Sequence, residues 1–409
     1  MHILFFTDNF PPEGNAIASR VFERACYWVK WGHQVTVVTS VPNFPEGKIF
    51  SGYTNKCYQV EIMEGIKVVR VKTFIAKNKG FLLRLLDFLS YIFPAFLAGL
   101  WQKKPDIVIA TTPQFFVGIT AWWVASIKRL PFILEVADIW PASIVGVGAM
   151  SNSILIRALE KLELLLYRRA KAIVVLTAAF KTNLINRGIN ADKMTTVING
   201  VELAKYTPIP KDETLANELA IDKKTFVVGY IGTHGMAHGL TNVLRAAEKL
   251  IDYPNILFLF VGAGAEREAL IRYAKIKQLS NVKFIPAQPK STIQKFWSLC
   301  HVALVHLKND LVFAEVIPSK IFEAMGMGLP LLLAAPDGEA SKIISCNQVG
   351  KWVEAENPQL LADAVVDYYQ NPNARQQLAL KSLNTAPFYS REKQARDMLK
   401  VIERHIQTR

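Results

Sequence analysis

A short stretch of the C-terminal half carries side chains that can bind a phosphate and a sugar. Lys320 and Glu323 are three residues apart, so a helix would project both from one face of its first turn. Pro318 and Ser319 predict that this helix begins here, because proline fits a first turn and serine caps free backbone amides. A lysine beside free amides suits a phosphate, and Glu323 can accept a hydrogen bond from a sugar hydroxyl, with Glu315 of the preceding loop pointing into the same space. The same residues also fit an ordinary capped helix with a surface ion pair.

The pattern of the C-terminal half predicts a parallel sheet that would position these residues. Hydrophobic runs that alternate with helical segments predict strands at residues 225–231, 256–261, 282–285, 302–306 and 331–335. Glycine-rich loops follow the first two strands, at residues 232–239 and 262–264. Because parallel strands end at one edge of their sheet, these loops should face the same cleft as Lys320.

Histidines mark the same predicted edge of the sheet. His234 and His238 lie in the loop after the first strand, where contact with a ligand and a purely local role are both open. His306 ends a strand, and a buried, hydrogen-bonded imidazole is the simpler interpretation. His33 follows Gly32 at a helix end and fits a structural cap.

The N-terminal half repeats the architecture. Strands are predicted at residues 2–7, 34–39, 67–71, 106–110, 131–135 and 172–176, and a helix from about residue 18 to 31 completes a strand–helix–strand unit. Gly14 lets the backbone approach a ligand after the first strand. Asp138 follows a strand end, where a carboxylate can orient a substrate hydroxyl. The expected fold class is α/β, with two doubly wound, Rossmann-like parallel-sheet domains facing a central cleft.

The length of the chain predicts two domains, because 409 residues are too many for one ordinary core. A polar segment at residues 205–224 predicts a linker between the halves. We expect an N-terminal domain at 1–204, a C-terminal domain at 205–387, and a C-terminal helix at 388–409 that packs back on the N-terminal domain.

The composition of the chain favours some classes of binding partner over others. The formal charge of +14 favours phosphorylated substrates or an anionic membrane surface, and the sequence lacks the arginine-rich runs and aromatic-basic signatures of nucleic-acid binding. The four cysteines are scattered without metal-ligand spacing, as free thiols of a reducing compartment are. No basic region precedes the first apolar residues, so we expect no signal peptide. Uncharged windows at 107–127 and 139–156 are interrupted by turn residues, which argues against spanning helices.

Residues 81–101 form a predicted helix that is apolar nearly all round, with lysines at positions 77, 79, 103 and 104 beside it. Either this helix packs between the sheet and its neighbours, or it lies at an anionic headgroup layer. Because we expect reduced cysteines, no signal peptide and no spanning helix, we expect a cytoplasmic protein. If residues 81–101 lie at headgroups, the protein would be located at the inner face of the cytoplasmic membrane.

Taken together, the motifs resemble those of the family-four retaining glycosyltransferases of the GT-B fold, and in particular the WbuB-like branch, which acts in bacterial surface-polysaccharide synthesis such as that of O-antigen. The resemblance covers nearly the whole chain. It rests on Phe10-Pro-Pro-Glu-Gly14 with Arg20, Gly32-His-Gln-Val-Thr-Val-Val-Thr39, Pro42-Asn-Phe-Pro-Glu-Gly-Lys48, Glu135-Val-Ala-Asp-Ile-Trp-Pro-Ala-Ser143, Val197-Ile-Asn-Gly-Val-Glu202, and residues 232–239 and 315–323. In this order the segments are far more specific than a lone glycine-rich loop.

The resemblance implies that the C-terminal domain binds a nucleotide-sugar donor, with a UDP sugar favoured, and that the N-terminal domain binds a saccharide or lipid-linked saccharide acceptor. Glu315 and Glu323 match the paired glutamates of the family, the second holding the ribose and the first lying near the donor sugar. Lys320 matches a lysine beside the diphosphate, and the expected catalytic set is Glu315, Lys320 and Asp138. The expected donor contacts are Gly232, Thr233, His234, His238, Gly262, Gly264, Pro286, Ser319, Glu323, Gly338, Glu339 and Ala340. The expected acceptor contacts are Gly14, Asn15 and Arg20.

Two departures from the family accompany this resemblance. Thr233 and His238 stand where many members carry arginine and lysine, so Lys320 and the loop amides must supply more of the positive charge. Ala137 stands where the WbuB-like branch usually carries arginine. No Asp-x-Asp pair occurs in the sequence, so we expect donor binding without a metal or other cofactor.

The expected reaction is transfer of a hexosyl or N-acetylhexosaminyl group, with an N-acetylated deoxysugar as one option. Two other functions remain open at this point: a sugar-nucleotide epimerase or hydrolase on the same architecture, and a non-catalytic subunit that binds a sugar nucleotide.

Overall fold

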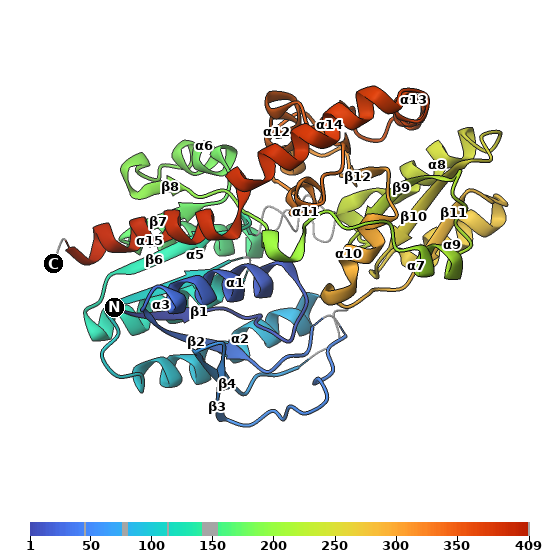
Figure 1. The fold of residues 1–409 in the computed structure, drawn as a ribbon. Coiled ribbons are helices and arrows are strands. Elements are labelled where there is room, and N and C mark those ends of the chain that lie inside the picture. The colour runs from blue at the N-terminus through green and yellow to red at the C-terminus, as the bar shows by residue number, and fades with distance from the viewer. Residues whose placement is uncertain (45, 76–80, 113, 141–153, 408–409) are drawn as a thin grey trace. The chain divides into compact units, whose positions relative to one another are not determined.

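The computed structural model describes residues 1–44, 46–75, 81–112, 114–140 and 154–407, and these form two compact units. Unit 1 comprises residues 1–199 and 391–409, and unit 2 comprises residues 200–390. The chain therefore passes between the units twice, after Asn199 and after Ser390, where the sequence had suggested boundaries after residues 204 and 387. Each unit is an α/β structure built on a largely parallel sheet, which confirms the expected fold class (Figure 1).

Unit 1 contains an eight-stranded sheet. Its strands are β1 (His2–Phe6), β2 (Gln34–Ser40), β3 (Tyr58–Met63), β4 (Ile66–Val71), β5 (Ile107–Thr111), β6 (Phe132–Val136), β7 (Ala172–Val175) and β8 (Met194–Thr196). Their order in the sheet is β3-β4-β2-β1-β5-β6-β7-β8. All neighbours are parallel except β3 and β4, which are antiparallel. The sequence analysis missed β3, which pairs with β4 across a two-residue turn at Glu64 and Gly65, both with positive φ.

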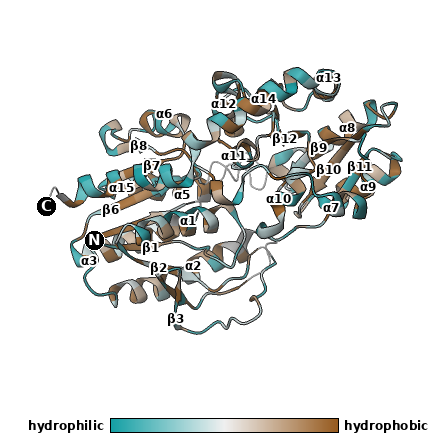
Figure 2. Ribbon diagram, in the orientation of Figure 1, coloured by the Kyte–Doolittle hydropathy of each residue, from teal (hydrophilic) through white to brown (hydrophobic). Residues whose placement is uncertain are grey.

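Helices cover both faces of this sheet. They are α1 (Ala16–Lys30), α2 (Phe81–Leu100), α3 (Phe115–Lys128), α5 (Ile154–Arg169), α6 (Ala178–Asn186) and α15 (Arg391–Gln407), with the 3-10 turn η1 (Ala191–Lys193). In β1, Ile3 and Phe5 join the core that includes α1 and α15. On the opposite face, a Cβ on Gly99 of α2 would lie 2.6 Å from the Phe6 ring, so glycine lets α2 approach the strand closely. Because both faces are covered, the strands are hydrophobic runs rather than alternating ones (Figure 2).

The C-terminal helix α15 belongs to unit 1, although 191 residues of unit 2 precede it in the chain. It lies beside α1, and the Trp28 indole N–H donates to the carbonyl oxygen of Ala395 at 3.0 Å (Figure 1). Trp28 is fully buried in this contact. The last helix therefore completes the core of the unit that begins the chain.

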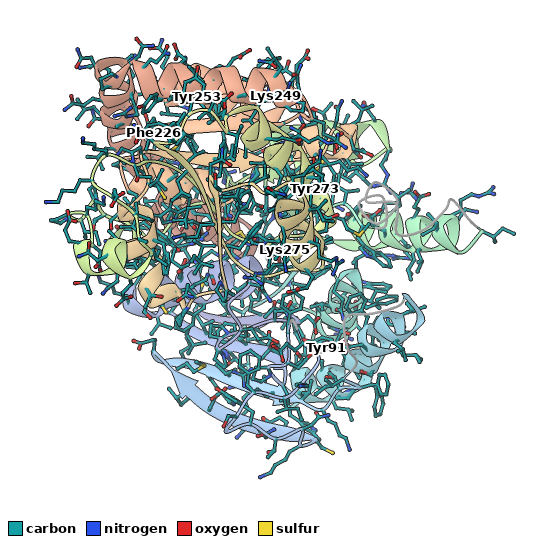
Figure 3. The ribbon with its side chains drawn as sticks, turned by 90° about the vertical axis from the view of Figure 1, so that its right-hand side faces the viewer. Tyr91, Phe226, Lys249, Tyr253, Tyr273 and Lys275 are labelled. Carbon is teal, nitrogen blue, oxygen red and sulfur yellow. The ribbon has the colours of Figure 1, made fainter. Side chains whose placement is uncertain are left out.

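Helix α2 is anchored to the sheet through Tyr91, which Figure 3 labels. The Tyr91 hydroxyl is fully buried and donates to the carbonyl oxygen of Val38 in β2 at 2.8 Å. Among the described residues, no helix is long and apolar enough to cross a membrane. Residues 141–153 of the second uncharged window, and lysines 77 and 79, lie outside the described residues.

Unit 2 contains a six-stranded parallel sheet. Its strands are β9 (Phe226–Ile231), β10 (Ile256–Val261), β11 (Val282–Ile285), β12 (Val302–His306), β13 (Leu331–Ala334) and β14 (Gly350–Val353). Their order is β11-β10-β9-β12-β13-β14. The α-helices are α7 (Glu213–Glu218), α8 (Leu240–Lys249), α9 (Arg267–Ile276), α10 (Lys290–Ser298), α11 (Lys320–Gly326), α12 (Glu339–Asn347), α13 (Pro358–Gln370) and α14 (Pro372–Thr385). The 3-10 turns are η2 (Leu203–Lys205), η3 (Met236–His238), η4 (Leu311–Glu315) and η5 (Ala386–Tyr389).

Candidate functional site

The strand order of unit 2 places the predicted residues at one point of the sheet. After β9 the chain forms β10 and β11 on one side, and it then returns to form β12, β13 and β14 on the other. The order therefore reverses between β9 and β12, and ligands of such sheets bind outside the carboxyl ends of the strands at this point. The loop of residues 232–239 follows β9, and η4 and α11 follow β12.

Lys320, the first residue of α11, is a buried cation without a counter-ion. Its side chain is 8% exposed, and among the described residues its Nζ has no hydrogen-bond partner. The Nζ atom lies 3.7 Å from the centroid of the Tyr230 ring. A Cβ on Gly232 would come within 3.0 Å of Nζ, so glycine at this position leaves room for the ammonium group. Burial lowers the pKa of Lys320 to about 7, and Glu323 opposes this shift only in part.

An unpaired charge is costly inside a protein, so an anionic ligand would relieve the cost at Lys320. Tyr230 was not singled out in the sequence. Its signal was available, however, because aromatic residues at a strand end before a glycine-rich loop can support a cation.

His238 and His306 form a reciprocal pair behind this lysine. His306 Nδ1 donates to the carbonyl oxygen of His238 at 2.7 Å, and His238 Nδ1 donates to that of His306 at 3.3 Å. The Asn242 side-chain amide donates to His306 Nε2 at 2.9 Å, so both ring nitrogens of this fully buried histidine have partners. This confirms His306 as a buried, hydrogen-bonded histidine. Burial, followed by the charge of Lys320, lowers the pKa of His238 to about 3.

His234 is enclosed rather than exposed to a ligand. Its ring is fully buried and lies within about 6 Å of the rings of Tyr230, Phe260 and Phe284. Among the described residues, neither ring nitrogen has a hydrogen-bond partner. Burial, and then Lys320, lowers the pKa of His234 to about 4, so the ring is neutral at pH 7. Thr233 beside it is exposed.

The glycines after β9 and β10 bring the two loops into contact. A Cβ on Gly262 would lie 1.9 Å from the carbonyl oxygen of Gly232, and one on Gly264 would lie 2.3 Å from that of His234. Both glycines also have positive φ. Their turn role is therefore evident, and a contact of their backbone with a nucleoside stays a prediction.

The loop before α12 meets the end of η4. A Cβ on Gly338 would lie 2.0 Å from the carbonyl oxygen of Ala314, so only glycine permits this approach. Glu315 is therefore next to the residue that touches the start of α12, where Glu339 and Ala340 follow Gly338. Pro286 instead lies exposed after the edge strand β11, two strands away from β9.

The start of α11 corrects one expectation from the sequence. Ser319 occupies the N-cap position, but its backbone is helical (φ −60°, ψ −27°) and its side chain makes no capping hydrogen bond. The predicted serine cap is therefore wrong. The helix has only seven residues, so its dipole is small, and the positive character of the site rests mainly on the Lys320 ammonium.

In unit 1, two of the expected acceptor contacts are engaged within the protein. The Asn15 side-chain oxygen accepts from the Ala18 amide at 2.9 Å and caps α1. Arg20 is 3% exposed; its Nη2 donates to Thr111 Oγ1 at 3.1 Å, and its Nε lies 3.7 Å from Glu135. Both side chains therefore position α1, whereas Gly14 before them is exposed with open space around it.

Asp138 follows β6 and is partly exposed. Thr112, after the neighbouring strand β5, holds this segment: its hydroxyl accepts from the Ala137 amide at 2.9 Å and donates to the Asp138 carbonyl at 3.2 Å. The main chain of Asp138 is thus fixed at the carboxyl edge of the sheet. Residues 141–143 of the same motif lie outside the described part of the chain.

The sequence analysis did not single out Glu13, which ties two loops together at this edge. Glu13 is 3% exposed, and its Oε1 accepts from the amides of Asn43 and Phe44 at 2.8 and 2.9 Å. Its Oε2 accepts from the Asn9 side-chain amide at 3.0 Å. Burial raises the pKa of Glu13 although these hydrogen bonds oppose the shift. Its place in the Pro-Pro-Glu-Gly segment was the available signal, since a glutamate among turn residues can bind loop amides.

No group of three or more histidines, cysteines, aspartates and glutamates is placed to hold a metal ion within the described ranges.

Comparison with known proteins identifies related sequences for both units. Residues 15–200 match the family model described as Glycosyl transferase 4-like domain, and residues 211–383 match that of Glycosyl transferases group 1. Over 80% of its length the chain is 25% identical to the putative colanic acid biosynthesis glycosyl transferase WcaI of Escherichia coli (strain K12), covering 82% of that protein. It is also 25% identical to the alpha-galactosylglucosyldiacylglycerol synthase of Streptococcus pneumoniae (strain ATCC BAA-255 / R6), over 55% of this chain and 59% of that protein.

Solved structures share the fold at lower identity. Sucrose-phosphate synthase from Thermosynechococcus elongatus superimposes with a TM-score of 0.80 at 14% identity, over 100% of both chains. HepE from Anabaena, solved in complex with UDP-glucose, gives a TM-score of 0.73 at 16% identity over 98% of this chain and 99% of that one. The fold is GT-B, as expected.

Proposed function

Because the chain belongs to the family-four glycosyltransferases, we propose that it transfers a sugar, with retention of anomeric configuration, from a nucleoside-diphosphate sugar to a saccharide or lipid-linked saccharide. One observation carries the donor side of this proposal: Lys320 is a buried ammonium group at the switch point of the sheet in unit 2, and its Nζ has no hydrogen-bond partner in the part of the chain that the structure describes. A departing nucleoside diphosphate gains negative charge, and a preorganised cation in a dry site stabilises that charge.

The other residues of unit 2 would then complete the donor site. Lys320 binds the diphosphate, and Glu323, one turn further along α11, accepts hydrogen bonds from the ribose. Glu315 and the segment Gly338 to Ala340 lie against the donor sugar, which is supported by the contact between Gly338 and Ala314. Asp138 of unit 1 orients the acceptor hydroxyl.

The nature of donor and acceptor is inferred from relatives. One relative is named for colanic acid biosynthesis and another as a synthase of a glycosylated diacylglycerol, so both a polysaccharide precursor and a lipid-linked acceptor have support. HepE was solved with UDP-glucose, which supports a UDP-linked hexose; an N-acetylhexosamine or an N-acetylated deoxysugar is the alternative that we propose from the family resemblance. We propose binding without a metal, since the sequence holds no Asp-x-Asp pair to bridge an ion to the diphosphate.

We also propose that unit 1 touches an anionic membrane surface through α2. Several large apolar side chains are exposed on this helix, with Leu86 54% and Leu83 46% exposed. Lys103 and Lys104 follow it and are exposed. Co-sedimentation with anionic vesicles should fall as salt rises, because salt screens headgroup attraction. Sedimentation that ignores both salt and lipid charge would contradict the contact.

The donor assignment is tested by comparing Lys320→Ala, Lys320→Arg and His238→Ala. Losing a charge-assisted hydrogen bond costs about 1.5–3 kcal/mol, which is a decrease of about 10- to 150-fold. Lys320→Ala should lower turnover more than it weakens binding of UDP, because the charge develops on departure. Lys320→Arg should recover only part of the loss, because the geometry of a guanidinium group differs.

His238→Ala serves as the matched control in the same loop. If His238→Ala is inactive while Lys320→Ala resembles the wild type, the diphosphate lies in the loop and the assignment is wrong. Calorimetric titration with and without a chelator completes the test. A decrease in UDP affinity of more than about tenfold on chelation would contradict metal independence.

A further inference from the structure

Unit 1 contains an open cavity of about 960 Å³ that runs from the carboxyl end of β4 along α2. Its volume is at the upper end of the range for small-molecule sites. It is bounded by the loop of residues 47–57, the segment after β4 and one face of α2. Its wall is mainly apolar and aromatic, with Ile49, Phe74, Phe93, Pro94, Leu97 and Trp101 among the lining residues.

The pattern of α2 explains why this cavity exists. Ser90, Phe93, Pro94, Leu97 and Trp101 recur with the 3.6-residue period of one helix face and line the cavity. Another face, with Tyr91, Ala95 and Ala98, is buried against the sheet and its neighbours. The helix is therefore apolar nearly all round because it has two apolar faces, one packed on protein and one turned to the cavity.

The charges at the cavity are all positive. Lys48 and Lys72 line it and are exposed, and no aspartate or glutamate is among its described lining residues. A purely apolar compound would leave these ammonium groups without a partner. An apolar chain that ends in a phosphate satisfies both parts of the wall, since phosphate pairs with lysine and the chain covers the aromatic rings.

We propose that this cavity binds the hydrocarbon chain of the acceptor's lipid, with its phosphate beside Lys48 and Lys72. The inference rests on the proposed function for the identity of the lipid, and it commits to a carrier that has a phosphate between its chain and the sugar, unlike a glycosylated diacylglycerol. The cavity would hold the carrier by its chain and leave the saccharide outside. It would thus distinguish lipid-linked acceptors from free saccharides of the same structure.

A cysteine in the wall allows a direct test on the unmodified full-length protein. Cys57 lines the cavity and is exposed, whereas Cys346 is exposed in unit 2 and serves as the internal control. Dodecyl phosphate should slow alkylation of Cys57 by maleimide and leave the rate at Cys346 unchanged. Each methylene added along the series octyl, decyl and dodecyl phosphate should tighten binding by up to about fourfold. Equal protection of both thiols, or of neither, would overturn the proposal.

The role of the two lysines is tested with a matched pair of double variants. Lys48→Ala with Lys72→Ala should weaken protection by dodecyl phosphate by about tenfold or more, because two charge-assisted contacts are lost. Lys30→Ala with Lys161→Ala removes two exposed lysines of unit 1 that do not line the cavity, and it should leave protection unchanged. Equal protection by uncharged dodecyl maltoside and dodecyl phosphate would overturn the anionic part of the proposal.

Two further measurements separate this inference from the proposed function. UDP binding to the same protein reports on the donor site of unit 2 alone. If dodecyl phosphate does not protect Cys57 while UDP still binds, only the cavity assignment is overturned. For the acceptor lipid, the wild type should show a lower KM for a dodecyl-diphosphate-linked saccharide than for the free saccharide. The Lys48 and Lys72 double variant should lose that preference, and an unchanged preference would show that the cavity binds some other lipid.

Discussion

Both units bury a cation over aromatic rings, but only one of them supplies a counter-ion. In unit 1, Arg24 is fully buried, its guanidinium lies 5.5 and 5.1 Å from the ring centroids of Phe5 and Trp28, and it forms two hydrogen bonds to Glu135 at 2.6 and 3.0 Å. In unit 2, Lys320 lies over Tyr230 with its Nζ unpartnered among the described residues. The paired cation stabilises the fold, and the unpaired one is suited to an anion that the protein does not itself provide.

The protonation of the two sites differs for the same reason. Burial alone would raise the pKa of Glu135, but Arg24 and Arg20 outweigh it and lower that pKa to about 2. Burial lowers the pKa of Lys320 to about 7. The attraction to Glu323 raises this pKa, but its effect is smaller than that of burial. At pH 7 Glu135 is therefore ionised, and Lys320 is divided between its two forms.

The largest expected effect is on the paired cation. Arg24→Met should lower the free energy of unfolding by about 3–5 kcal/mol, because it leaves Glu135 buried beside Arg20 alone, at 3.7 Å. Urea denaturation followed by tryptophan fluorescence measures this change. Arg396→Met is the control: its ion pair with Glu392 is exposed, and its loss should cost about 0–1 kcal/mol. If both variants lose the same free energy of unfolding, the buried pair of Arg24 and Glu135 stabilises the fold no more than an exposed pair does.

The same substitution at the unpaired cation should have the opposite sign. Lys320→Met keeps the volume and removes a charge that Glu323 offsets only in part among the described residues, so stability at pH 7 should stay equal or rise by about 0–2 kcal/mol. UDP binding should fall in parallel, as we also expect for Lys320→Ala. A stability loss comparable to that of Arg24→Met would show that Lys320 has a structural partner, and the site assignment would then lose its main support.

Sequence reasoning identified most of the strands, although not β3 or β14, and it singled out Lys320, whose contact with a phosphate stays a prediction. It could not identify the missing counter-ion, because that depends on which side chains the sheet brings together. Arg20 illustrates the limit. The family resemblance implied a contact with the acceptor, whereas the pairing that the fold gives it, with Glu135, 115 positions along the chain, has no signal in the local sequence.

The prediction of a serine cap was wrong, and β3 was not predicted, for different reasons. Ser319 has the right residue type, but the tertiary structure keeps its backbone helical, so the hydroxyl is not in position to cap. Strand β3 was missed although the Glu64–Gly65 turn signals a hairpin and Gln59 and Glu61 alternate with Val60 and Ile62; it is an edge strand whose apolar residues Val60 and Ile62 are exposed. Pattern thus predicts elements well and predicts edges and termini less well.

The smallest expected effect is on the number of protons that the protein binds, and it tests Lys320 in the wild-type protein. The folded-state pKa of Lys320 is about 7, below its ordinary value of 10.5, so between these pH values the unfolded chain binds more protons than the folded one. The free energy of unfolding should therefore rise with pH across this window, and Lys320→Met should abolish that part of the slope.

An anion that binds beside Lys320 raises the pKa of the lysine again, so the complex that forms with UDP at pH 8 should take up as much as about one proton. Calorimetry in two buffers of different ionisation enthalpy measures this uptake, which should shrink at pH 6, where the lysine is already protonated. His238→Gln is the control: the pKa of His238 is about 3, so the variant should retain the uptake at pH 8 unless UDP protonates the imidazole instead. Uptake near zero in the wild type at pH 8, or uptake that survives Lys320→Met, would show that the anion does not bind at Lys320.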